Sequence, residues 1–137
     1  DALQRIGEAT ASPHDDICFE YLNPSTGGPV LTTMSCTIQM VRPRVRTRAH
    51  RQVQSSVYLA FAGKGYSVIN GQRFDWKQGD FFVVPPWAWH EHANNTEDEA
   101  ILFAIHDSPV MKALGLYREE SYTKDDGFQE ITSSFEA

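Results

Sequence analysis

The chain has 137 residues, of which 41% are hydrophobic and 12% aromatic, which is enough apolar material for the core of one domain. A formal net charge of −6 argues against nucleic acid as a partner, because phosphate binding needs clustered Lys and Arg. No apolar run approaches the roughly 18 residues of a membrane span, and no charged-then-apolar leader is present, so we expect a cytoplasmic protein without a membrane partner.

The first part of the chain combines a polar arm, a loop and two strands. Residues 1–18 are mixed and polar, and we interpret them as an N-terminal arm or short helix. The loop sequence N-P-S-T-G-G-P follows before Val30. Two alternating stretches, Thr32–Val41 and Ser55–Ala62, then predict strands. The alternation of the second places Val57, Leu59 and Phe61 on one face and Ser56, Tyr58 and Ala60 on the other.

The middle of the chain predicts a hairpin and two further strands. Asn70-Gly71 suits a type I′ turn, in which both central residues need a positive φ, between Tyr66–Ile69 and Gln72–Trp76. A second turn leads into Phe81–Val84. Ala100–His106 is a continuous apolar run of strand length.

The last part of the chain predicts one short helix. Ser108-Pro109 is typical of a helix start, with serine as the cap and proline in the first turn, and Gly115 would end the helix. The stretch from about Thr123 is acidic and weakly patterned, and we expect a mobile or docking tail there. Many short strands joined by Gly, Pro and Asn turns predict an all-β barrel or sandwich. We place its bounds at residues 19–107, with the helix and acidic tail in residues 108–137.

Three histidines are the candidates for chemistry. His90 and His92 have the i, i+2 spacing that sends both imidazoles to the same face of a strand. His50 lies about 40 residues earlier, and antiparallel strands of a barrel can bring such positions face to face. Imidazoles inside a barrel are costly unless they bind a metal or form hydrogen bonds. Two His ligands, one more group and open positions suit non-haem Fe(II); the alternative is a hydrogen-bonded relic in a barrel that only packs.

The third ligand is the weak point of such a centre. Gln52 shares a face with His50 on an extended stretch, but its amide oxygen is a much poorer donor to Fe(II) than imidazole or carboxylate. Neighbouring residues on one strand rarely both reach one ion, so we expect His92 to contact substrate or to support a ligand. We expect His14 to be a surface residue and His106 to be a core or rim histidine.

Other side chains have two readings each. Trp87 and Trp89 could stack on an aromatic ring or seal the mouth of the barrel, and Tyr58 and Gln39 would line the pocket. The arginines could form a solvated or subunit-contacting face or attract a small carboxylate; they are Arg42, Arg44, Arg46, Arg48 and Arg51. We expect the two cysteines to be buried thiols without a disulfide; they are Cys18 and Cys36.

With these residues in place, the chain resembles the cupin superfamily and, within it, gentisate 1,2-dioxygenases with their salicylate and 1-hydroxy-2-naphthoate relatives. The resemblance covers residues 19–120 and looks like the C-terminal half of those two-cupin enzymes. The stretches that carry it are E-Y-L-N-P-S-T-G-G-P-V (20–30), R-A-H-R-Q (48–52), G-K-G-Y-S-V-I-N-G-Q-R-F-D-W (63–76), G-D-F-F-V-V-P-P-W-A-W-H-E-H (79–92) and P-V-M-K-A-L-G-L-Y-R-E (109–119).

The resemblance implies a double-stranded β-helix, or jelly-roll barrel, and ring-cleaving oxidation of a hydroxylated aromatic acid with Fe(II) and O₂. It implies that His50 and His90 match the first and third metal ligands, whereas Gln52 stands where the family has a second histidine. The candidate catalytic residues are then His92 and Tyr58. The candidate substrate-binding residues are Trp87, Trp89 and Gln39.

Two hypotheses follow. In the first, the chain is a gentisate-dioxygenase-like cupin that acts on a small aromatic acid, either with a partner N-terminal cupin domain or as a homo-oligomer. In the second, the altered H-x-Q motif marks a metal-free, non-catalytic cupin that serves small-ligand binding or oligomerisation. A third class, an isomerase or epimerase with histidine as a general base, has no specific residue pattern in its favour.

Overall fold

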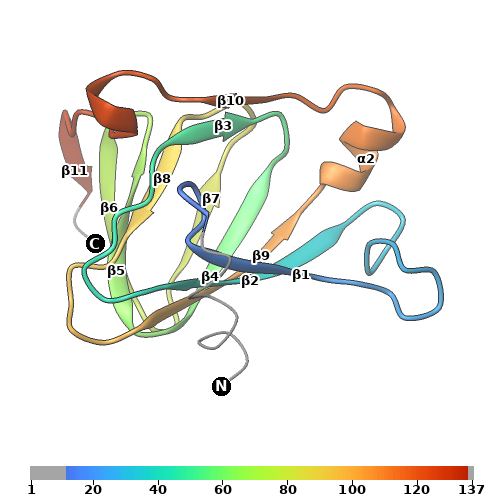
Figure 1. Ribbon diagram of the computed structural model, residues 1–137, viewed down its shortest axis with the longest axis horizontal. Coiled ribbons are helices and arrows are strands. Elements are labelled where there is room, and N and C mark those ends of the chain that lie inside the picture. Colours follow the sequence, from blue (N-terminus) through green and yellow to red (C-terminus); the bar gives the residue numbers. More distant parts are fainter. Residues whose placement is uncertain (1–11, 136–137) are drawn as a thin grey trace.

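The computed structural model describes residues 12–135, which form two β-sheets that face each other across a common core (Figure 1). The five-stranded sheet has the spatial order β1 (Ile17–Tyr21), β2 (Ser35–Val41), β9 (Ala100–His106), β4 (Ser56–Ala62) and β7 (Phe81–Val84). The six-stranded sheet has the order β10 (Glu119–Ser121), β3 (His50–Gln52), β8 (His90–Ala93), β5 (Lys64–Ile69), β6 (Gln72–Lys77) and β11 (Ser133–Phe135).

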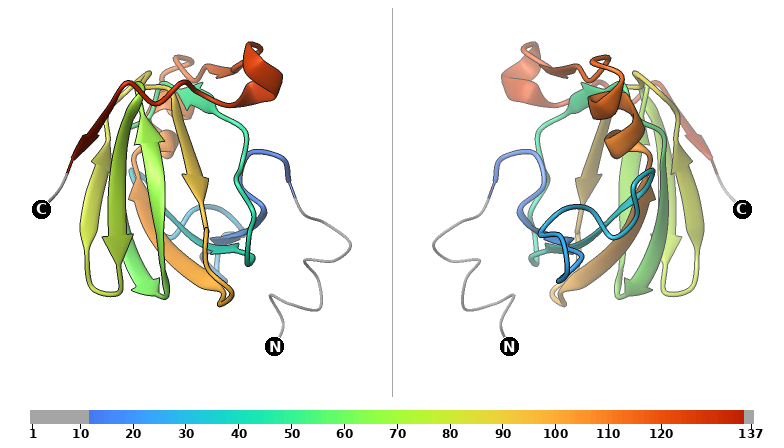
Figure 2. Two further views of the ribbon diagram at one scale, coloured as in Figure 1. Left: turned by 90° about the vertical axis from the view of Figure 1, so that its left-hand side faces the viewer. Right: turned by 90° about the vertical axis from the view of Figure 1, so that its right-hand side faces the viewer.

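The order of the strands is that of a jelly roll. From β2 to β5 the chain passes from one sheet to the other at each connection, and it does so again from β6 to β9. The views along the sheets show the two layers curving toward each other, with the short helix α2 (Ser108–Ala113) at one end (Figure 2). The prediction of an all-β barrel with a short C-terminal helix is confirmed. No helix within residues 12–135 is long and apolar enough to span a membrane.

Local sequence rules account for most of these elements. Asn70 and Gly71 have φ of 48° and 80°, as the predicted type I′ turn requires. In β4, Tyr58 and Ala60 face the core at 7% and 0% exposure, whereas Phe61 on the opposite face is 59% exposed. The core between the sheets comprises Val41, Tyr58, Ala60, Ile69, Trp76, Val84, Ala88, Ala100, Leu102 and Ala104.

The structure departs from the predictions near the N-terminus and at the helix. Residues 1–11 of the predicted arm lie outside the described residues, and Ser12–Asp16 forms a turn closed by two backbone hydrogen bonds. A strand, β1, follows where the arm and loop were predicted. The helix cap is Asp107 rather than Ser108, because the Ser108 hydroxyl is bonded to His106.

The arginine row is not a common cationic face. Residues 42–49 are mostly loop rather than strand, so the side chains diverge and several pair with carboxylates of different elements. The pairs are Arg42–Asp16, Arg44–Glu97, Arg46–Glu91 and Arg51–Glu120. The proposal that this row attracts a small carboxylate is therefore wrong, because its charges are largely neutralised within the chain.

The C-terminal segment docks on the barrel. β10 pairs antiparallel with β3, and β11 pairs parallel with β6. Between them, the Gln129 backbone N–H donates to the buried Glu91 carboxylate at 2.8 Å, and its side chain bonds Val68 and Gly71 at 2.9 and 3.0 Å. The six-stranded sheet therefore has its two edge strands supplied by residues after the helix.

The close packing at Gly65 yields a stability prediction. A Cβ at this position would overlap the Ala93 carbonyl oxygen and the Trp76 ring, so Gly65→Ala should lower the free energy of unfolding by about 1–3 kcal/mol. At Gly28 a Cβ meets only Thr26 Oγ1 at 3.5 Å, so Gly28→Ala is the matched control and should change it by less than about 0.5 kcal/mol. Urea unfolding followed by tryptophan fluorescence measures both; equal stabilities of the two variants would contradict the packing argument.

Candidate functional site

The structure brings His50 and His90 together. They are directly opposite each other in the register of β3 and β8, and their ring centroids are 4.5 Å apart. Both side chains are buried, at 2% and 3% exposure. Two residues far apart in the chain thus meet between β3 and β8, which are neighbouring strands of the six-stranded sheet.

The pair is part of a row of four imidazoles. His14 stacks on His50 with centroids 4.8 Å apart and planes 8° apart, and His92 lies 5.9 Å from His90. The prediction that His14 is only a surface residue is wrong, because its two ring nitrogens lie 3.1 Å from the Arg48 carbonyl oxygen and 3.2 Å from Ser121 Oγ. No local sequence signal placed it there; the turn at Ser12–Asp16 and the docking of β10 do so.

Burial keeps His50, His90 and His92 neutral at pH 7. Desolvation, followed by repulsion from His14, lowers the pKa of His50 to about 4. Desolvation and then His50 lower the pKa of His90 to about 4. The pKa of His92 also lies well below its ordinary value, chiefly because it is buried. A neutral imidazole can bind a metal, but it can also remain in a core as a hydrogen-bonded group.

The residues around the pair do not complete a ligand set for iron. His90 Nδ1 lies 3.0 Å from the Ala88 carbonyl oxygen, which leaves Nε2 for a ligand. His50 Nδ1 has no hydrogen bond, and its nearest carboxylate, on Glu119, is 3.5 Å away. Within residues 12–135 no group of three or more His, Cys, Asp or Glu side chains is placed to hold a metal ion.

Gln52 does not supply the third donor. Its Nε2 donates to the Tyr117 hydroxyl at 3.2 Å, and its Oε1 accepts from Gln54 Nε2 at 3.4 Å. Both ends of the amide are therefore engaged with side chains other than the histidine pair. Two imidazoles and a committed neutral amide do not fit Fe(II), which needs at least one further strong donor. The proposed H-x-Q metal site lacks support from the geometry of its own donors.

His92 and Tyr58 lie side by side in the core. Trp76 Nε1 donates to Ser67 Oγ at 3.0 Å, and Ser67 Oγ lies 2.8 Å from His92 Nδ1. With Ser67 donating to Nδ1, the neutral ring carries its proton on Nε2, where no partner lies among the described residues. The Tyr58 ring stacks on Phe82 at 5.0 Å and lies 4.9 Å from His92. The two candidate catalytic residues are thus in mutual contact.

Trp87 and Trp89 enclose an arginine. The Arg51 guanidinium lies 4.4 Å from the ring centroid of Trp87 and 4.3 Å from that of Trp89, which is close enough for cation–π attraction to both rings. Arg51 also pairs with Glu120 of β10 at 2.7 Å. The two rings therefore hold Arg51 of β3, which pairs with β10. Neither tryptophan lines the cavity inside the barrel.

A cavity of about 140 Å³ lies inside the barrel, and we refer to it as the barrel cavity. Three of the sequence-predicted residues line it, namely Gln39, Gln52 and Tyr58, whereas the row of histidines does not. Sequence reasoning missed most of the other lining residues. They are Asp15, Cys18, Glu20, Thr37, Gln54, His106, Ser108, Lys112 and Tyr117.

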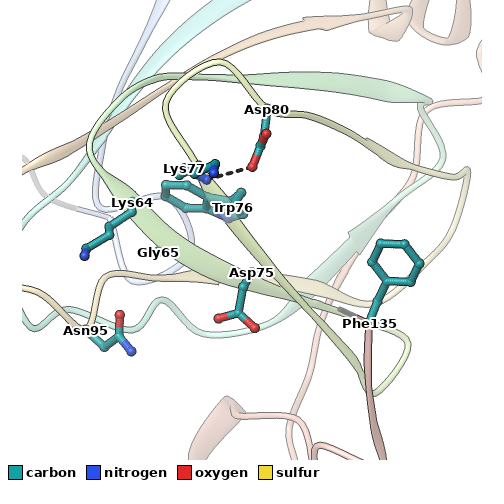
Figure 3. A pocket seen from close by; sticks show the side chains of 8 residues that line it. All are labelled: Lys64, Gly65, Asp75, Trp76, Lys77, Asp80, Asn95 and Phe135. Carbon is teal, nitrogen blue, oxygen red and sulfur yellow. Dashed lines mark hydrogen bonds between the residues drawn. The ribbon is translucent and has the colours of Figure 1, made fainter. Parts of the chain in front are cut away.

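A larger hollow of about 490 Å³ lies outside the barrel, beside the β5–β6 hairpin and Phe135 of β11 (Figure 3). Lys64, Asp75 and Lys77 border it, and the Lys77 backbone N–H donates to the Asp80 carboxylate at 3.0 Å. None of the candidate catalytic, substrate-binding or metal-binding residues lines it, so its size does not make it the candidate site.

The chain is similar to ring-cleaving dioxygenases. The family described as "Cupin domain" matches residues 37–106. The chain is 49% identical to a 5-aminosalicylate 1,2-dioxygenase of Comamonas sp over 94% of its own length and 34% of that protein. It is 34% identical to a 1-hydroxy-2-naphthoate 1,2-dioxygenase of Nocardioides sp. (strain KP7), over 80% of its length and 28% of that protein.

Solved structures agree with these relatives. A salicylate 1,2-dioxygenase from Pseudaminobacter salicylatoxidans superposes with a TM-score of 0.79 at 32% identity, over 87% of this chain and 34% of that one. The chain therefore spans about a third of the length of the relatives that it matches.

The buried histidines yield a prediction on pH. Because the pKa values of His50 and His90 fall from 6.5 to about 4 on folding, the unfolded chain binds more protons below pH 6.5. Their contribution to stability is present above pH 6.5 and is lost as the pH falls toward 4. Each group adds up to about 1.4 kcal/mol per pH unit within that window.

Urea unfolding between these two pH values tests the prediction, with His90→Gln as the comparison. As the pH falls, the free energy of unfolding of the variant should decrease less steeply than that of the wild-type protein. The difference in slope should be up to about 1.4 kcal/mol per pH unit. Equal slopes for the two proteins would mean that His90 is not buried in its neutral form.

Proposed function

The chain belongs to the cupin family, and from this premise we propose that it forms one barrel of an enzyme that opens the ring of a hydroxylated aromatic acid with O₂. The observation that carries the proposal is the 49% identity to a 5-aminosalicylate 1,2-dioxygenase along almost the whole chain. Other relatives are named for gentisate and 1-hydroxy-2-naphthoate, so the substrate class we propose is an aromatic ring with a carboxylate and a neighbouring hydroxyl.

We assign this barrel a supporting role rather than the iron centre itself. The His50–His90 pair keeps the positions of two ligands, but Gln52 is engaged with Tyr117 and Gln54, and no third strong donor completes the set. The relatives are about three times longer than this chain, which leaves room for a second barrel that holds the iron. On this proposal, no step of ring opening takes place on the residues described above.

The second candidate function, a cupin that serves assembly, is favoured by the outer face of the five-stranded sheet. Two rows of apolar side chains run across all five strands of this sheet, on the side away from the core. One row is Phe19, Ile38, Phe103, Leu59 and Phe81, and the other is Tyr21, Cys36, Ile105, Val57 and Val83. Phe81 is 70% exposed and Val83 is 57% exposed.

An apolar face of this extent is rare on a monomer and marks a contact surface. We propose that it packs against another barrel of the same kind, in the same polypeptide or in a second copy. The two functions are compatible, because a barrel without the iron would contribute to a dioxygenase through such contacts. The prediction of two buried thiols is wrong, because Cys18 is exposed and Cys36 is only partly buried. For the location we propose a cytoplasmic protein.

Oxygen uptake tests the dioxygenase proposal. The full polypeptide, loaded with Fe(II) without air, should consume O₂ when gentisate or 5-aminosalicylate is added. His50→Asn combined with His90→Asn should leave the iron content unchanged and kcat within about threefold, because the pair does not hold the metal. Lack of uptake by the wild-type protein would refute the activity. Loss of iron from the folded double variant would instead refute the supporting role.

The outer sheet face yields a prediction on association. Phe81→Asp places a charge at the most exposed end of one apolar row, on the edge strand β7, and should weaken self-association at least tenfold, as measured by sedimentation equilibrium. Leu116→Asp is the control, because Leu116 is 54% exposed but lies after the helix, outside the sheet. If the wild-type chain is monomeric at high concentration, or if both variants associate equally, this face is not the contact between copies.

A further inference from the structure

Two buried glutamine amides line the barrel cavity. Gln39 and Gln54 are 3% and 7% exposed and line it. Gln39 Nε2 donates to the Asp15 carbonyl oxygen at 2.8 Å, which fixes the orientation of the amide. Gln54 Nε2 is directed at Gln52 Oε1 and Ser56 Oγ. Because the protein uses both amide nitrogens, the two amide oxygens remain without a donor among the described residues.

Tyr58 adds an unpartnered hydroxyl. Its side chain is 7% exposed and lines the cavity, and its ring is held by Phe82 and His92. The hydroxyl forms no hydrogen bond within residues 12–135. A ligand inside the cavity could therefore form a hydrogen bond with this hydroxyl.

The charge of the cavity favours a cation. The carboxyl groups of Asp15 and Glu20 line it, and Lys112 is the charged base among the lining residues, because burial lowers the pKa of His106. Burial also raises the pKa of Asp15, and a bound cation would favour its ionised carboxylate. The Lys112 ammonium lies 5.1 Å from the ring centroid of Tyr117, which also lines the cavity. The chain's own ammonium therefore already occupies one wall, where an aromatic face and carboxylates attract it.

We propose that the barrel cavity binds a small organic ammonium ion. Its N–H groups would donate to the amide oxygens of Gln39 and Gln54 and to the Asp15 carboxylate, which together match the donors of an ammonium group. The volume of about 140 Å³ is below the roughly 300–1,000 Å³ of most ligand pockets, so the ligand has only a few heavy atoms. The site is distinct from the aromatic-acid site of the proposed function and does not depend on it.

A titration followed by NMR tests this site. Ethylammonium chloride should shift the side-chain amide signals of Gln39 and Gln54 saturably, with a dissociation constant in the range of about 0.1–10 mM. Propionate carries the opposite charge on a similarly short aliphatic chain and should produce no saturable shift. Sodium chloride at equal ionic strength controls for screening. Absence of saturation up to about 100 mM ethylammonium would overturn the proposal.

Four variants test which residues bind the ammonium ion. Asp15→Asn should weaken ethylammonium binding at least tenfold, and Lys112→Met should tighten it severalfold by removing a like charge. Tyr58→Phe keeps the stacked ring and should weaken binding a few-fold, which preserves a test if Asp15→Asn disturbs the fold. Asp75→Asn removes an exposed charge outside the barrel and should have no effect (Figure 3). Binding of propionate that is lost in Lys112→Met would show an anion site and refute the proposal.

Discussion

The pairing of His50 with His90 fixes the orientation of β3 in the barrel. This pair joins β3 to β8, and because β3 has three residues, it fixes which way each of them faces. His50 and Gln52 point to the interior, and Arg51 points outward between Trp87 and Trp89. The positions of the histidine row, of the barrel cavity and of Arg51 between the two tryptophans therefore follow from the register of β3 against β8.

Burial determines the chemistry of His50, His90 and His92. Neutral imidazoles can remain in the core because stacking and hydrogen bonds replace part of their hydration, as where His50 stacks on His14 and where His92 contacts the Ser67–Trp76 pair. Their depressed pKa values are the consequence of that burial. The barrel thus keeps the side chains of a metal centre while the amide of Gln52 has joined a separate polar network.

The two faces of the five-stranded sheet explain why such a barrel would persist in a larger enzyme. Its inner face holds the core and the polar cavity, whereas its outer face is apolar across all five strands. A sheet that is apolar on both sides is stable only when a second layer covers the outer side. The roles in assembly and ligand binding that we propose therefore need no iron in this barrel.

The sequence by itself determined the elements whose signals are local. Alternation located β4, the Asn70-Gly71 dipeptide located its hairpin, and the apolar run Ala100–His106 matches β9 to the residue. The motif histidines also revealed the family, because their spacing is specific.

The other features of the fold and of the site depend on contacts between distant segments, so only the tertiary structure determined them. Three features arise when the N-terminal turn and β10 dock on the barrel. His14 stacks on His50, Trp87 and Trp89 lie outside the cavity, and Asp15 accepts a hydrogen bond from Gln39. Residues with no local pattern carry these contacts. Long-range packing, rather than propensity, therefore formed the cavity and joined Gln52 to Tyr117 and Gln54, whereas the glutamine at that position was already evident from the sequence.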